Sequence, residues 1–396
     1  MRRLLALGLF LAATPLSAQE GVPWRSSYFP YPIGNPTTGV MLVGHYHHAR
    51  QADFDARVPF DGIFSAEGGW STNNSRFVGV TFRAPRLVPG WRFAVDAGAG
   101  REGTFGYYGF GPDGSNEDFE PDDVFSDDFF RVRRTRYFVR GEVTRGIAGP
   151  LSVSAAAGYT HFRFSSSHEG SLFDSDYLNT PLTGADATAR VSLIVDTRDN
   201  ELLPGNGVLL EMGVYTGSGR FETRSLPPLP QPGEFQATFT ESGYLGGYVH
   251  LRGYVSPRSG TVIAGRLAVR DMGASAPLDA RYTLPGWERD VTVLGGADSH
   301  RSFMPGRFVG TGLLLGALEV RHNLLDLGGL GAVTLIAFLD AGRVFSPHDF
   351  QWTTKGWKVG GGGGVGVRVL QAAPLLLNFA GGPDGFRFTM GNGWAF

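Results

Sequence analysis

The chain has 396 residues, a formal net charge of −2, 18% charged residues and no cysteine. The near-neutral charge gives no basis for nucleic-acid binding, and the absence of cysteine excludes a disulfide framework and thiolate chemistry. Glycine is frequent at 59 residues, and aromatic residues reach 13%. This mixture is typical of closely packed strands with aromatic belts at a membrane interface.

Residues 1–18 have the features of a secretory signal peptide. Arg2 and Arg3 precede an apolar run, and small residues stand at Ser17 and Ala18, where cleavage is expected. No later run approaches the ~18 unbroken apolar residues of a membrane helix. We therefore expect a product exported to the periplasm, the medium or the outer membrane.

Residues 19–37 contain four prolines, which argue against a central strand; these are Pro23, Pro30, Pro32 and Pro36. The predicted organisation is a signal peptide at 1–18, a short periplasmic segment at 19–37, and a β-barrel at 38–396.

The rest of the chain alternates apolar and polar residues with the period of a strand. In residues 91–102, for example, Phe93 and Val95 fall on one face, and Arg92 and Asp96 fall on the other. We find ten such strands before residue 295 and five after residue 311. Because bacterial single-chain barrels have an even number of strands, one more is expected, and residues 104–111 are the best candidate.

Arginine and carboxylate side chains recur in mid-strand on one face, whereas the other face is free of charge. A soluble sandwich also alternates, but its outer face would carry the charges at the surface. In hydrocarbon a sheet must close to satisfy its backbone. The predicted fold is all-β: a transmembrane antiparallel β-barrel of 16 strands with a loop folded into the lumen.

The loop and the two strands at residues 295–345 combine three charged groups. Glu319 and Asp340 lie on the less apolar faces of neighbouring predicted strands, and Arg301 lies in the loop before them. One interpretation is a buried ion pair. The alternative is a solvated loop arginine, with the two carboxylates lining an aqueous pore.

The order GGADSHRSF, LEVR and FLDAGRVF in this stretch resembles the C-terminal half of the bacterial surface antigen family of outer-membrane β-barrels, the BamA/TamA-type superfamily. Those barrels carry an arginine motif of the form (V/I)RG(F/Y) in a long lumenal loop. The matching residues are His300, Arg301, Ser302 and Phe303. The resemblance implies that Arg301 and Phe303 hold this loop in the lumen through Glu319 and Asp340.

A second stretch, VSLIVDTRDNELLPGNGVLLEMGV, resembles the family's turn between two barrel strands. The matching residues are Asp196, Arg198, Asp199, Pro204 and Gly207. Related assembly barrels usually carry periplasmic POTRA domains before the barrel, and residues 19–37 are too few for one. The resemblance thus implies a member that lacks POTRA domains.

The chain ends on an aromatic segment, residues 386–396, which we expect to be the last strand. Trp394 and Phe396 would form the C-terminal signal that outer-membrane barrels present to the cell's barrel-assembly machinery. This strand would close the barrel against residues 38–50.

Other candidates for chemistry are weaker. His45, His47 and His48 suggest a metal site, but no further converging ligand is identifiable. The acidic residues from Asp113 to Asp128 lack the D-x-[DN]-x-[DN]-G calcium loop. The glycines from Gly360 to Gly364 lack a G-K-[ST] continuation and instead suggest bending or close approach by the lumenal loop.

A hydrolase would need a serine and a histidine on one face, but Ser152 and Ser154 alternate with His161. We expect no enzymatic activity, metal or cofactor.

The resemblance implies an integral protein of the Gram-negative outer membrane that inserts or transports protein, or lipid, at the seam between its first and last strands. The alternative function is a passive or gated pore, or a structural barrel with no client protein. The expected partners are outer-membrane lipid, lipopolysaccharide, a client polypeptide and the barrel-assembly machinery.

Overall fold

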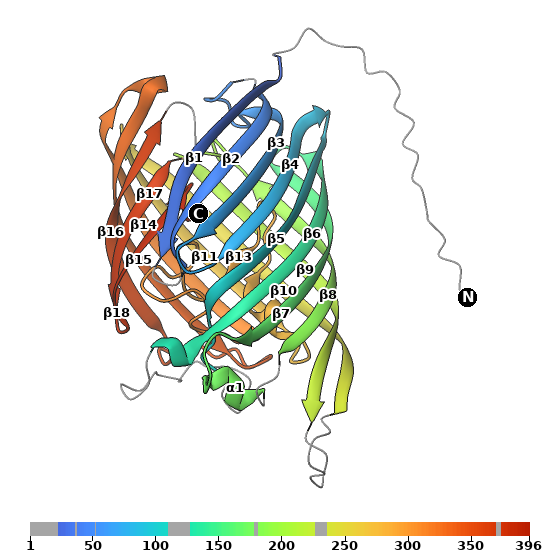
Figure 1. Ribbon diagram of the computed structural model, residues 1–396. Helices are drawn as coiled ribbons and strands as arrows, with labels where there is room; N and C mark the ends of the chain where they lie inside the picture. Colours follow the sequence, from blue (N-terminus) through green and yellow to red (C-terminus); the bar gives the residue numbers. More distant parts are fainter. Residues whose placement is uncertain are drawn as a thin grey trace.

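A closed antiparallel barrel of 16 strands forms the body of the protein (Figure 1). The computed structural model describes residues 23–35, 38–51, 53–109, 127–177, 181–225, 236–369 and 374–396. In chain order the barrel strands are β1 Arg25–Asn35, β2 Gly39–Gln51, β3 Phe60–Ser71, β4 Arg76–Val88, β5 Trp91–Gly106, β6 Arg131–Ala148, β7 Leu151–Ser166, β8 Leu182–Asp196, β9 Gly207–Ser225, β10 Gln236–Arg258, β11 Thr261–Met272, β14 Gly312–Asp326, β15 Gly331–Phe345, β16 Lys358–Val369, β17 Leu375–Gly382 and β18 Gly385–Asn392.

The two faces of each strand have opposite character, as the alternation predicts. In β15, Leu335 and Leu339 are exposed, whereas the residues that follow each of them, Ile336 and Asp340, are buried. In β9, Met212 and Val214 are exposed on the same pattern. Large apolar side chains thus cover the outside of the barrel, and polar groups collect inside it, which is the arrangement that a bilayer requires.

Loop lengths distinguish the two ends of the barrel. At one end the turns are tight, with Gly90, Gly149 and Gly260 at positive φ. At the other end lie the long connections, which include η1 Asp127–Phe130 and α1 Leu172–Asp176. Outer-membrane barrels have short periplasmic turns and longer extracellular loops, so we assign the end with long connections to the outside. No helix in the described part of the chain is long and apolar enough to span a membrane.

The sixteenth strand comes from the proline-rich segment. β1 at Arg25–Asn35 pairs with β2 along its whole length, so the barrel begins before Thr38, and the assignment of residues 19–37 to a segment outside the barrel was wrong there. Pro30 and Pro32 are tolerated because both point outward from a strand that has little pairing on its other side. A separate strand at residues 104–111 was also wrong for the described part of that range, since residues 104–106 belong to β5, which ends at Gly106, and residues 107–109 form no strand.

The last strand is shorter than expected. β18 ends at Asn392, and the alternation in residues 386–396 gave no sign of this end. The expected signal peptide at 1–18 and residues 113–126 of the acidic segment lie outside the described residues.

Residues 273–311, here called the lumenal loop, run through the interior of the barrel. They contain α2 Leu278–Arg281 and a small antiparallel pair, β12 Thr283–Leu284 and β13 Val291–Thr292. Many of their side chains are buried against the inward faces of strands, among them Tyr282, Leu294, Phe303 and Phe308. A chain segment, and not side chains of the wall alone, therefore fills this wide lumen.

Candidate functional site

Arg301 joins the lumenal loop to two barrel strands. Its Nε and Nη2 donate to Asp340 of β15 at 2.9 and 2.8 Å, and its backbone N–H donates to the same carboxylate at 2.9 Å. Its Nη1 donates to Glu319 of β14. All three residues are at most 2% exposed. The structure thus brings together the arginine and the two carboxylates that the sequence placed on separate elements.

Aromatic rings and small residues complete the environment of Arg301. The guanidinium lies over the ring of Phe338, 3.5 Å from its centroid. Phe303, buried, packs edge-on against His300 and Phe308 at 4.6 and 4.9 Å between ring centroids. Ser302 lies so close to Gly360 of β16 that a Cβ there would collide with it. The glycine run in β16 therefore makes room for the loop.

The C-terminus lies inside the barrel beside this ion pair. Arg321 donates to Glu319 at 2.6 Å and to the backbone oxygen of Phe396 at 2.9 Å. Its guanidinium stacks on Trp394 at 4.2 Å, and Arg266 stacks on Phe396 at 4.7 Å. Trp394 and Phe396, expected within the last strand, instead follow it and are turned into the lumen.

The turn between β8 and β9 contains the second set of predicted residues. Arg198 donates to both carboxylate oxygens of Asp196 at 3.0 Å. Asp199 accepts from the backbone N–H groups of Asn200 and Gly205 at 2.9 Å. Pro204 is buried. Gly207 has φ +108°, and a Cβ there would meet the Arg198 backbone at 2.7 Å. These contacts fix the shape of the turn.

Glu288 of the lumenal loop, which the sequence did not indicate, links this turn to the loop. Arg198 and Arg252 of β10 donate to its two oxygens at 2.7 and 2.5 Å. Burial alone would raise the pKa of Glu288, but the two guanidinium groups outweigh it and lower the pKa to about 2. The carboxylate is therefore ionised at neutral pH and holds the loop at the periplasmic side.

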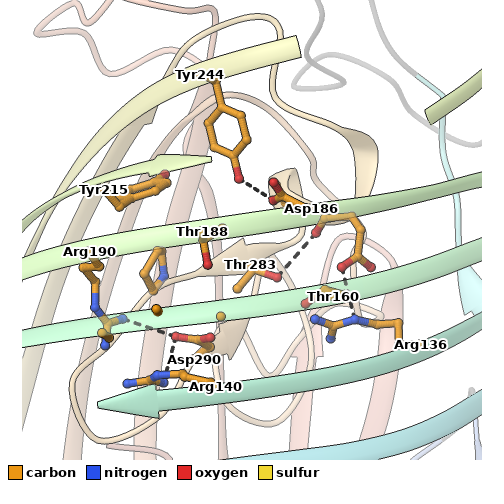
Figure 2. Close-up of a pocket in the computed structure, with 16 residues that line it drawn as sticks. Arg136, Arg140, Thr160, Asp186, Thr188, Arg190, Tyr215, Tyr244, Thr283 and Asp290 are labelled. Atoms are coloured by element: carbon orange, nitrogen blue, oxygen red, sulfur yellow. Dashed lines mark hydrogen bonds and ion pairs between the residues drawn. The ribbon is translucent and has the colours of Figure 1, made fainter. Parts of the chain in front are cut away.

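Asp290 makes a second contact of this kind on strands β6 and β8. Figure 2 shows Arg140 of β6 and Arg190 of β8 pointing toward it, at 3.1 and 3.5 Å. The same two arginines also bind Glu142, and Trp287 of the loop donates its indole N–H to Thr144 at 3.0 Å. Nothing in the spacing of residues 285–290 could have indicated these contacts, since the segment has no strand period.

The seam between β1 and β18 is the least paired junction of the barrel. Among the described residues, one facing pair, Gly34 with Met390, is in register there. In contrast, β1 pairs with β2 from Arg25 to Asn35, and β17 pairs with β18 from Leu375 to Asn392. The seam thus leaves most backbone donors and acceptors of the described residues on its two edges without a strand partner.

The remaining sequence candidates are separated by the fold. Ser154 points inward and donates to Glu142, whereas His161 packs against the exposed ring of Tyr137 at 6.1 Å. His45 binds Glu67 at 2.6 Å. Among the described residues, no group of three or more His, Asp or Glu side chains could hold a metal ion.

Comparisons with known proteins agree on the fold. In the solved structure of BamA from Haemophilus ducreyi lacking POTRA domains 1–3, the similarity covers 93% of this chain and 70% of that one, at 13% identity and a TM-score of 0.55. The similarity to CdiB from Escherichia coli covers 93% of this chain and 62% of CdiB, at 13% identity and a TM-score of 0.51. At this identity the likeness shows the fold alone.

The chain matches none of the curated proteins with which it was compared. Residues 63–394 match the model of the Omp85 superfamily domain. This match spans most of the barrel, from β3 to the residues that follow β18, and includes Arg301, Glu319 and Asp340. The protein therefore belongs to the Omp85 superfamily of β-barrels.

Proposed function

We propose that this protein inserts or transports polypeptide at the outer membrane, and that the seam between β1 and β18 is where it acts. Membership of the Omp85 superfamily and the barrel fold shared with BamA and CdiB support this role at a coarse level. The observation that carries the finer proposal is the short pairing across the seam.

An incompletely paired edge in a membrane has a physical consequence. Unpaired N–H and C=O groups in hydrocarbon each cost several kcal/mol, and such an edge accepts an added strand. Pro30 and Pro32 carry no N–H to donate, so at these positions β1 offers a neighbouring strand only its carbonyl oxygens. An incoming strand of a client polypeptide would satisfy the free groups of β18 that β1 cannot.

The lumenal loop has a distinct role in this proposal. Arg301, Phe303, Glu319 and Asp340 position it in the lumen, and Glu288 and Asp290 fix its middle part. With the loop held, the barrel wall can part at the seam without a wide channel opening through the centre.

A gated pore is the second candidate. A cavity of about 700 Å³ remains inside the barrel next to β3–β6, lined by charged groups that include Glu67, Asp96 and Arg134. Such a space could admit water and small ions if its ends opened.

Reconstitution separates the two candidates. The purified protein in liposomes is expected to accelerate the membrane insertion of a second, unfolded outer-membrane protein, relative to empty liposomes and to liposomes that hold an unrelated porin. Ion conductance without faster insertion would favour the pore. If the protein neither accelerates insertion nor conducts ions, the structural barrel is the reading that remains, and the proposal is overturned.

A further inference from the structure

Four arginines form a cluster on the outer, lipid-facing surface of the barrel. They are Arg76 of β4, Arg101 of β5, Arg133 of β6 and Arg163 of β7. Arg76 is directly opposite Arg101, Arg101 is opposite Thr135, and Thr135 is opposite Arg163. Arg133 is two residues from Thr135 and so lies on the same face. Four neighbouring strands thus present like charges close to one another.

The outward direction of this cluster follows from its neighbours. The next outward positions toward the middle of the membrane are Val78, Ala99 and Tyr137, and Val78 and Tyr137 are more than half exposed. The guanidinium of Arg76 stacks on the exposed ring of Trp70, 5.6 Å from its centroid. The cluster therefore lies just beyond a belt of aromatic and apolar side chains, at the depth where lipid headgroups begin.

The cluster lacks counterions among the described residues. No hydrogen bond or ion pair joins Arg76, Arg101, Arg133 or Arg163 to a carboxylate there, whereas the lumenal arginines Arg140, Arg190 and Arg301 each bind at least one. The Nε atoms of Arg101 and Arg133 are buried and have no acceptor. Closely spaced cations with unsatisfied donors repel one another unless an anion joins them.

A groove next to these arginines has the shape of a headgroup and chain site. Its volume is about 500 Å³, and its lining includes the charged Arg76 and Arg101 and the apolar or aromatic Trp70, Val78, Ala99 and Tyr137. The charged part lies toward the long loops, and the apolar part lies toward the middle of the membrane. An amphiphile with an anionic head would satisfy both parts.

We propose that this cluster binds the phosphate groups of a phosphorylated glycolipid of the outer leaflet, the lipid A part of lipopolysaccharide. Guanidinium groups bind phosphate oxygens bidentately, and basic pockets at the membrane surface select anionic headgroups. The end with long loops faces outward in such barrels, which places the cluster in the leaflet where this lipid resides. The site lies on the barrel wall away from both the lumen and the seam.

Native mass spectrometry of the full-length barrel with added diphosphoryl lipid A tests the proposal. The variant R76Q/R101Q/R133Q is expected to bind this lipid about tenfold more weakly, or worse, than the wild type. R145Q is the matched control, because Arg145 also points outward from β6, stacks on Trp91 at 5.0 Å, and lies at the opposite end. Its binding should equal that of the wild type.

A second arm uses the unmodified protein, so it does not depend on the folding of a variant. Wild-type protein should bind diphosphoryl lipid A at least about tenfold more tightly than lipid A from which both phosphates have been removed, and more tightly than phosphatidylglycerol. Equal binding of the phosphorylated and dephosphorylated forms, equal binding of phosphatidylglycerol, or equal binding by the folded triple variant would each overturn the proposal.

Discussion

Arg301 places four donor groups against two carboxylates at a point from which water is nearly excluded. The free energy needed to remove these charges from water offsets most of the free energy gained from their attraction, so the net stabilisation is small. Removing one partner is different, because it leaves an uncompensated buried charge. The ion pair therefore specifies where the loop lies more than it adds to the stability of the barrel.

Replacing Arg301 with Gln should lower the free energy of unfolding by about 3 to 5 kcal/mol, because Glu319 and Asp340 would stay buried without their cation. Urea unfolding in detergent, followed by tryptophan fluorescence, measures this loss. Arg289→Gln in the same loop is the control. Arg289 and its partner Asp298 are 45% and 49% exposed, so a change below about 1 kcal/mol is expected. Equal losses in the two variants would contradict the assigned role.

Glu288 gives the loop a defined dependence on pH. Its pKa is lowered from 4.5 to about 2, so the unfolded chain takes up this proton before the folded one does. The stability that Glu288 contributes is then fully present above pH 4.5 and is lost as the pH falls to about 2.

The difference in unfolding free energy between the wild type and E288Q, measured from pH 7 down to pH 2, should be constant above pH 4.5 and should shrink toward the acid end. A difference that already disappears between pH 7 and pH 5 would show that the two arginines do not hold the carboxylate ionised.

At the scale of elements, β1 shows where sequence patterns fail. Its prolines argue against a central strand, and that inference is sound, yet β1 adjoins a seam that needs few donors on one side. The predicted end of the last strand was wrong for the opposite reason. Aromatic residues continue the alternation to Phe396, but contacts with Arg266 and Arg321 hold the last residues inside the barrel. Long-range contacts decided both cases.

The charged site could be predicted in part. Arg301, Glu319 and Asp340 were identifiable because two of them sit at strand positions with a clear period and the third lies in a motif. Glu288 and Asp290 were not, since a loop without periodicity gives no sign of which wall it faces. The position of such residues depends on the closed barrel and on the arginines that line it.

The glycines of β16 allow the lumenal loop to approach the wall. Gly360→Val should displace Ser302 and with it the loop, because a side chain there collides with Ser302. We expect a larger single-channel conductance in planar bilayers. Gly381→Val in the adjacent β17 is the matched control, since a Cβ at that position meets nothing within 4 Å. Similar conductance in both variants would mean that the loop does not occlude the lumen.

For the whole molecule, the barrel combines a firmly held centre with a weakly held wall. The lumenal loop binds strands on several sides, through Asp340 of β15, Arg252 of β10 and Arg140 of β6. In the part of the seam that the structure describes, one pair is in register. In the proposed function, this distribution would let the wall separate at the seam while the loop keeps the lumen filled, and that is its central claim.

A disulfide across the seam tests that claim most directly, and the absence of native cysteine makes the introduced pair the only one. Continued by one residue from the Gly34–Met390 pair, the antiparallel register would set Ile33 opposite Gly391, where an added Cβ meets nothing within 4 Å. I33C/M41C, which joins β1 to β2 at a facing pair, is the control.

The measurement is the rate at which liposomes that hold I33C/G391C insert a second outer-membrane protein, before and after the disulfide is reduced. The account predicts that the oxidised variant is inactive, that reduction restores acceleration, and that I33C/M41C is active in both states. Equal acceleration by oxidised and reduced I33C/G391C would contradict it.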